Sequence, residues 1–120
     1  MNIYINGIGC VSPQLISNGK DFLQEVSIPE GPYFKCLEPD YTEYFTPMQR
    51  RRMSKMLKMG VFAAKESLKN AGIENADAII TGTGMGMFQD TEIFLTALIE
   101  NKEQLLTPTS FIQSTHNTLG

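Results

Sequence analysis

Cysteine and histidine are scarce in this chain of 120 residues. The two cysteines, Cys10 and Cys36, are not paired at metal-ligand spacing and lie in unlike contexts, one in an apolar run and one beside Lys35. This argues against a disulfide or a zinc site. His116 is the only histidine, and a lone histidine is more often a hydrogen-bonded structural residue than a catalyst. A thiol and base pair between His116 and either cysteine is the less favoured alternative.

Long apolar runs are missing as well. No segment approaches the run of about 18 apolar residues that a membrane span needs, and no basic region precedes an apolar stretch at the N-terminus. We therefore expect no membrane span and a cytoplasmic location. What is present suits a packed core, since 42% of the residues are hydrophobic and they include seven Phe and four Tyr. The length allows at most one ordinary domain.

Basic residues crowd into one segment although the net charge is -3. Seven of the ten lie between Arg50 and Lys69, and their spacing places most of them on one face of a helix. Three arginines at the start of that predicted helix oppose its macrodipole, at a cost of about 0.3 to 1 kcal/mol per charge. The stripe is a solvated face, a docking face for an acidic or phosphorylated partner, or one paired locally with Glu38, Asp40 and Glu43. Nucleic acid is less favoured, because the chain is acidic overall.

The predicted elements alternate in the manner of an α/β chain. The segment Arg50 to Ala71 has apolar residues at steps of three and four, which predicts an amphipathic helix closed by Gly72. A second helix is predicted from Gln89 to Asn101, with Asp90 and Glu92 in its first turn, where negative charge suits the macrodipole. The sequence also predicts strands at 2–9 and 76–81, a possible strand at 33–37, and a short helix at 18–25. The apolar run Ala78-Ile79-Ile80 predicts that the strand at 76–81 is buried on both faces. A sheet of two or three strands would have open edges. We therefore expect further strands from residues beyond Gly120 or from a partner.

Three alternating glycines follow the predicted strand at 76–81. Gly82, Gly84 and Gly86 precede a helix, so their backbone amides could cradle a phosphate. The spacing is not that of a dinucleotide fingerprint, and no Walker lysine follows. A plain tight turn is therefore the favoured interpretation, and a small nucleotide-binding domain is a remote alternative.

Taken together, these segments resemble the N-terminal part of the β-ketoacyl-acyl carrier protein synthases, condensing enzymes of the thiolase-like fold. The resemblance covers almost the whole chain and implies an incomplete N-terminal part of a layered αβαβα fold. The motifs that carry it are Asn6-Gly7-Ile8-Gly9-Cys10-Val11-Ser12-Pro13, Arg51-Arg52-Met53 with Ala71-Gly72-Ile73, Gly82-Thr83-Gly84-Met85-Gly86, and Pro108 through Ser114-Thr115 to Asn117.

The resemblance implies decarboxylative Claisen condensation of carrier-bound acyl chains in fatty-acid or polyketide-like synthesis. In that family the nucleophilic cysteine and two catalytic histidines lie further along the chain than Gly120. Neither cysteine here matches the nucleophile's motif, and His116 falls where the family usually has an apolar residue. We therefore expect residues 1–120 to be a region truncated before the catalytic residues, inactive alone, with no catalytic residue, metal or cofactor of its own.

The implied roles of the chain's own residues are peripheral to the chemistry. Arg51 and Arg52, with Lys55 beside them, match positions that dock the acidic acyl carrier protein. The family has a further docking lysine at a position near Met48, where this chain has no lysine. The implied acyl-pocket residues are Met85, Met87, Ile112 and Thr115. Met87 replaces the second glycine of the family's turn, which suggests a changed pocket mouth.

The expected partners are an acyl carrier protein, an acyl thioester substrate, and a second subunit in a homodimer or a ketosynthase-like heterodimer. The Ser114-Thr115-His116-Asn117 run resembles the ketosynthases of aryl polyene and related pigment pathways. Such pathways also contain ketosynthase-like partners that lack the nucleophile and help to set chain length. A non-catalytic chain-length partner is therefore the alternative to a condensing enzyme.

Overall fold

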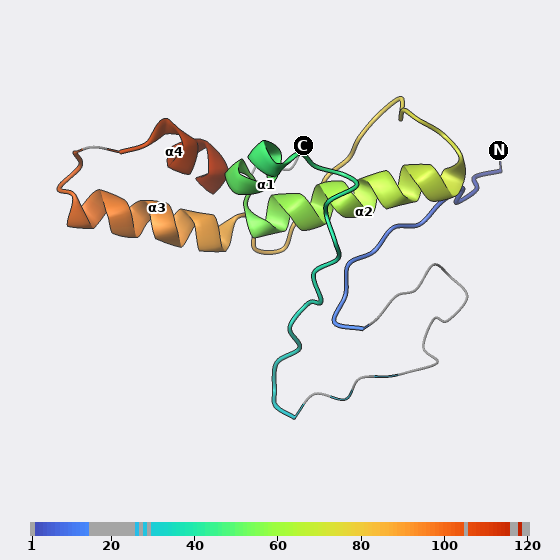
Figure 1. The fold of residues 1–120 in the computed structure, drawn as a ribbon, viewed down its shortest axis with the longest axis horizontal. Coiled ribbons are helices and arrows are strands. Elements are labelled where there is room, and N and C mark those ends of the chain that lie inside the picture. The colour runs from blue at the N-terminus through green and yellow to red at the C-terminus, as the bar shows by residue number, and fades with distance from the viewer. Residues whose placement is uncertain are drawn as a thin grey trace.

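Four helices and long non-helical connections make up the described part of the chain (Figure 1). The computed structural model describes residues 2–14, 26, 28, 30–104, 106–115 and 118. In order, the helices are α1 (Pro47–Arg52), α2 (Lys55–Ala71), α3 (Phe88–Glu100) and α4 (Pro108–Ser114). No helix within the described ranges is long and apolar enough to cross a membrane. The predicted helix at 18–25 lies outside the described residues.

The predicted strands are the main point on which the structure differs from expectation. The segments 2–9, 33–37 and 76–81 carry no backbone ladder, and the described residues contain no strand. A strand exists only where a neighbour supplies hydrogen bonds along its length. Here the amide of Leu37 donates to the carbonyl of Ser12 at 3.1 Å, without the ladder that would continue it. Ile79 and Ile80, predicted to be buried, are 77% and 97% exposed, so the layered αβαβα arrangement is not present in this part of the chain.

The predicted helix at 50–71 is two helices rather than one. Thr46 and Gln49 form a capping box around α1, with Pro47 in its first turn. The chain then leaves the helical conformation at Met53, and the hydroxyl of Ser54 accepts from the amide of Leu57 at 3.3 Å to start α2. The arginines at 50–52 therefore occupy the last turn of α1, where positive charge suits the macrodipole. The predicted electrostatic cost was wrong, because the helix begins earlier and breaks after them.

The ends of the longer helices follow the sequence closely. Gly72 ends α2 in the left-handed conformation, with φ of 71°, and its amide donates to the carbonyl of Lys69 at 3.2 Å. The helix predicted at 89–101 is α3, one residue earlier at both ends, and Asp90 lies in its first turn as expected. Capping residues thus predict helix limits well where the local signal is strong.

The N-terminal segment lies directly against α2. The hydroxyl of Ser67 donates to the carbonyl of Gly7 at 3.1 Å, and the side chain of Asn70 accepts from the amide of Ile8 at 3.3 Å. A Cβ atom on Gly7 would fall 2.2 Å from the carbonyl oxygen of Ser67, and one on Gly9 would fall 1.9 Å from that of Ala63. Glycine is therefore required at both positions because the two backbones touch.

Helices α3 and α4 pack side by side at one end of the molecule and run in roughly opposite directions (Figure 1). The rings of Phe94 and Phe111 meet at 5.7 Å between centroids. The hydroxyl of Thr91 lies 3.0 Å from the carbonyl of Ser114, and this contact ties the start of α3 to the end of α4. Helix α4 was not predicted, since its apolar residues are too few to show a helical period.

The chain leaves much apolar surface uncovered. Its accessible surface is 10129 Å², against about 6,500 Å² expected for a compact monomer of this length. The radius of gyration is 17.2 Å, against about 14 Å expected. Among the described hydrophobic residues only Tyr41, Phe45 and Met87 are buried. The many exposed large hydrophobic side chains, such as Ile3, Ile28 and Ile80, are typical of a surface that other protein covers.

Candidate functional site

Three segments that are distant in sequence meet where α1, α4 and the start of α3 come together (Figure 1). The side-chain amide of Gln113 in α4 donates a hydrogen bond to the backbone carbonyl of Arg52, the last residue of α1. The hydroxyl of Thr91 in α3 lies 3.0 Å from the carbonyl of Ser114 and 2.9 Å from that of Met87. The predicted docking helix and the predicted pocket segments are therefore neighbours.

The four predicted pocket residues fall into two groups. Met87 precedes α3 and is only 1% exposed, and Thr115 at the end of α4 is half-buried, with its hydroxyl donating to the carbonyl of Ile112 at 2.8 Å. Met85 and Ile112 are 72% and 58% exposed. The structure thus brings the segments around Met87 and Thr115 together and leaves the other two side chains open to a ligand or a further segment.

The glycine turn before α3 has the character of a tight turn. Gly86 has a φ of 58°, and its amide donates to the hydroxyl of Thr83. Gly86 therefore needs the conformational freedom of glycine. A Cβ atom on Gly82 or Gly84 would meet nothing within 4 Å, so these two glycines are not required for close packing in the described part of the chain.

The predicted docking residues differ in whether their side chains already form ion pairs or hydrogen bonds. Arg51 and Arg52 are exposed on α1 and make no side-chain ion pair or hydrogen bond with the described residues. Lys55 begins α2, and its ammonium pairs with the carboxylate of Glu38 at 2.9 Å. The two arginines are therefore available to an acidic partner, while Lys55 is already engaged.

The remaining lysines of the basic stripe pack against the segment 41–45. Lys58 lies over the ring of Tyr41 at 5.8 Å and Lys65 over that of Phe45 at 5.2 Å. Lys65 also donates to the carbonyl of Tyr44 at 3.0 Å. Lys69 donates to the hydroxyl of Tyr44 at 3.4 Å. The predicted local pairing with Glu38, Asp40 and Glu43 is found only for Lys55 among the described residues, while Lys58, Lys65 and Lys69 are held by the aromatic segment instead.

Aromatic packing explains why this segment holds to α2. Phe62 meets the ring of Tyr41 at 5.8 Å and that of Tyr44 at 4.9 Å, both edge to face. The Tyr44 hydroxyl donates to the carboxylate of Glu66, and this bond is the main cause that raises the pKa of Tyr44. The aromatic residues at 41, 44 and 45 were the available signal for this contact, because lysines stack readily on aromatic faces.

Acid is expected to weaken the contact between Glu38 and Lys55. The hydrogen bond from Lys55 lowers the pKa of Glu38 below its usual 4.5. A carboxyl group with a lower pKa in the folded state adds stability above its unfolded pKa, and this is lost as the pH falls through the folded pKa. Because the pair is partly exposed, the effect is small. Between about pH 5 and about pH 3, the free energy of unfolding of the wild type should fall by up to about 0.5 kcal/mol more than that of Glu38→Gln. Urea unfolding of the full-length protein at both pH values measures this.

The matched control for that prediction is Glu43→Gln, which removes an exposed carboxylate from the same segment. It should keep the acid dependence of the wild type. Equal acid dependence in the wild type and in Glu38→Gln would show that the ion pair adds no stability.

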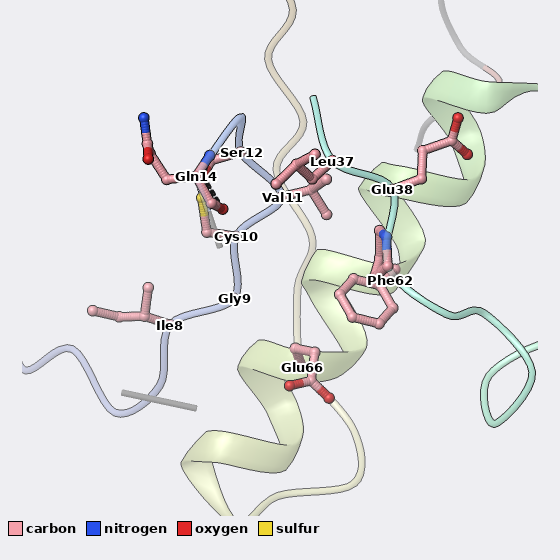
Figure 2. A pocket seen from close by; sticks show the side chains of 11 residues that line it. Ile8, Gly9, Cys10, Val11, Ser12, Gln14, Leu37, Glu38, Phe62 and Glu66 are labelled. Carbon is pink, nitrogen blue, oxygen red and sulfur yellow. Dashed lines mark hydrogen bonds between the residues drawn. The ribbon is translucent and has the colours of Figure 1, made fainter. Parts of the chain in front are cut away.

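A cavity of about 230 Å³ lies between the N-terminal segment, the segment 37–39 and α2 (Figure 2). Cys10 and the carboxylates of Glu38 and Glu66 are among its lining residues. The thiol of Cys36 points at the carbonyl of Val11 at 3.8 Å, and both cysteines are free. His116 lies outside the described residues, so the thiol and base pair stays untested. Within the described ranges, no group of three His, Cys, Asp or Glu side chains is placed to hold a metal ion.

A family model described as "Beta-ketoacyl synthase, N-terminal domain" matches residues 31–120, three quarters of the chain. The chain belongs to the β-ketoacyl synthase family. No curated protein and no solved structure matches it. The match includes α1 to α4 and therefore every residue of the candidate site. It supports a condensing-enzyme fragment of the thiolase-like fold, and it leaves the nucleotide-binding interpretation of Gly82 to Gly86 without support. Condensing enzymes of this family generally work with an acyl carrier protein.

Proposed function

We propose that this chain is the N-terminal part of a β-ketoacyl-acyl carrier protein synthase that lengthens carrier-bound acyl chains by decarboxylative Claisen condensation. The observation that carries the proposal is the hydrogen bond between Gln113 and the carbonyl of Arg52 in a member of this family. This bond joins α1, whose exposed arginines we propose as the docking site, to α4, which we propose as part of the acyl pocket. Carrier docking and acyl-chain binding would then share one site.

Charge gives α1 its role in this proposal. Arg51 and Arg52 are exposed and unpaired among the described residues, and they project from the last turn of a helix that three consecutive arginines make strongly positive. An acidic carrier protein approaching this helix is attracted over about 8 Å at physiological salt, the range set by ionic screening. Such complementarity mainly speeds and orients the encounter.

The acyl chain would enter beside α3 and α4. Met85 is exposed before α3, and the resemblance makes it the residue that gates the pocket, where a flexible thioether would adapt to chains of different shape. Met87, Ile112 and Thr115 complete the proposed pocket, and Met87 is buried at the start of α3. Apolar side chains with few polar groups are what an acyl chain requires.

The remainder of the enzyme would supply what these residues do not. The resemblance assigns the cysteine nucleophile and both histidines to positions after residue 120. The exposed apolar surface, including Ile79 and Ile80, would be covered by further strands of a layered αβαβα fold and by a second subunit, in a homodimer or a ketosynthase-like heterodimer. We place the enzyme in the cytoplasm, in fatty-acid or polyketide-like synthesis, with an aryl polyene pigment pathway as the narrower proposal.

A non-catalytic chain-length partner of the same fold is the second candidate. The run from Ser114 to Asn117 favours it, because the pigment pathways that this run resembles contain such partners. The docking helix and the pocket would serve both candidates. Only the presence of a nucleophile separates them.

Intact-mass analysis of the full-length protein distinguishes the two. In a condensing enzyme, a cysteine thiolate attacks the thioester of an acyl carrier, the carrier thiol leaves, and the enzyme keeps the acyl group. We expect the mass of the denatured protein to rise by that of one acyl group, and hydroxylamine to reverse the increase. An unchanged mass, with retained binding of the carrier, would favour the non-catalytic partner.

A further inference from the structure

Gln113 connects the two halves of the proposed site. Helix α1 ends at Arg52, and the last carbonyls of a helix have no partner within the helix. The carbonyl of Gln49 accepts from the amide of Met53. The carbonyl of Arg52 is instead capped by Gln113, which lies 61 residues further along the chain. A side chain from α4 therefore completes the hydrogen bonding of α1.

The next residue of α4 faces the other half of the site. The carbonyl of Ser114 lies 3.0 Å from the hydroxyl of Thr91, and this hydroxyl lies 2.9 Å from the carbonyl of Met87. Two consecutive residues of α4 thus contact the end of α1 and the start of α3. Hydrogen bonds thus connect the end of α1, through α4 and Thr91, to the carbonyl of Met87, whose side chain is buried.

Gln113 makes this link through one directed bond. Its side chain is only half-buried, and its amide group donates to the backbone oxygen of Arg52. The position of a backbone oxygen does not depend on any side-chain rotamer. The neighbouring α4 residue Thr109 is exposed and has no side-chain bond with the described residues. The side chain of Gln113 therefore supplies a hydrogen bond between α4 and the end of α1 that Thr109 does not.

We propose that Gln113 is a positioning residue that couples docking of the acyl carrier protein on α1 to binding of its acyl chain beside α3 and α4. The proposal rests on the proposed function, since it uses the same docking helix and pocket. Carrier contact at Arg51 and Arg52 would hold α1 in place, and through Gln113 it would hold the pocket open for the chain. The coupling is a free energy shared between two sites, and binding measurements can isolate it.

The test is a binding cycle on the full-length protein with three ligands. These are the carrier without an acyl chain, the same acyl group on pantetheine, and the acyl carrier that joins both. Gln113→Glu keeps the shape of the side chain but places an oxygen without a hydrogen against the Arg52 carbonyl. Gln113→Ala removes the side chain, and Thr109→Ala is the matched control on the same helix.

We expect both Gln113 variants to bind the acyl pantetheine within about twofold of the wild type, and Gln113→Ala to bind the bare carrier within the same range but the acyl carrier about fivefold or more weakly. Gln113→Glu adds a negative charge beside Arg51 and Arg52, so its affinity for the acyl carrier is compared with its own affinity for the bare carrier, and this ratio should fall about fivefold or more. Thr109→Ala should match the wild type with all three ligands. Equal weakening of acyl pantetheine would show that Gln113 merely shapes the pocket and would overturn the coupling. Wild-type affinity of Gln113→Glu for the acyl carrier would do the same.

The outcomes also separate this inference from the proposed function. Loss of the coupling in Gln113→Glu supports the inference whether or not the protein condenses acyl chains, because the readout is binding alone. A wild type that binds no carrier would overturn both. A wild type that elongates carrier-bound chains while Gln113→Glu keeps normal affinity would overturn the coupling and leave the proposed function standing.

Discussion

Replacing Gly9 with alanine is expected to destabilise the protein by about 3 kcal/mol or more, the upper range for overpacking. The new Cβ atom would lie 1.9 Å from the carbonyl oxygen of Ala63 and 2.7 Å from the amide nitrogen of Ser67. Both are backbone atoms of α2, so no side-chain rotation relieves the clash. The N-terminal segment would have to move off the helix and give up the bond between Ser67 and the Gly7 carbonyl. Chemical denaturation of the full-length protein measures the loss.

Two further substitutions make that result specific. Gly7→Ala should be nearly as harmful, because its Cβ atom would lie 2.2 Å from the carbonyl oxygen of Ser67. Gly31→Ala is the matched control, since a Cβ atom there meets nothing within 4 Å, and it should change stability by no more than about 0.5 kcal/mol. If Gly9→Ala were as stable as Gly31→Ala, the N-terminal segment would not lie on α2 as described.

Replacing Arg51 and Arg52 together with glutamate is expected to weaken binding of the acyl carrier protein about tenfold or more at low salt. The change turns two exposed positive charges at the end of α1 into negative ones that repel an acidic carrier. Neither arginine side chain bonds to the described residues, so the loss of stability should be confined to the macrodipole of α1, at about 0.3 to 1 kcal/mol per charge. The affinity of the full-length protein for the carrier, measured by titration at several salt concentrations, shows the effect and its decline with salt.

The control is the double variant Lys35→Glu with Lys102→Glu, which makes the same change in net charge at exposed positions outside α1. It should bind the carrier nearly as well as the wild type. A loss of affinity equal to that of the arginine variant would mean that overall charge, and not the face of α1, attracts the carrier. The arginine pair would then be a solvated surface.

The helices could be predicted from sequence where the signal was local. Gly72 marked the end of α2, and Asp90 marked the first turn of α3, because caps and dipole-favouring charges act within one turn. The break at Met53 and Ser54 was missed because the apolar period begins at Met53 and carries no sign of a separate helix before it. Strands were predicted at segments such as 76–81 from composition alone, yet a strand depends on a neighbouring chain that composition does not describe.

The site was only partly predictable for the same reason. The motifs identified Arg51, Arg52 and Met87 through resemblance, and the charge pattern left three interpretations of the basic stripe open. The contact of Gln113 with Arg52 spans 61 residues, and no periodic pattern predicts such a pair. The stacking of Lys65 on Phe45 likewise depends on a chain reversal before α1 that local sequence does not determine.

The most direct test of the central claim is the mass of the acyl chain on the carrier after incubation with the full-length protein. The reaction would contain an acyl carrier and malonyl carrier, with a reaction lacking the protein as control. We predict a β-ketoacyl carrier whose chain is two carbons longer than the starting acyl group, formed with release of CO₂. Unchanged acyl and malonyl carriers, with the protein folded and its own mass unaltered, would contradict a condensing enzyme.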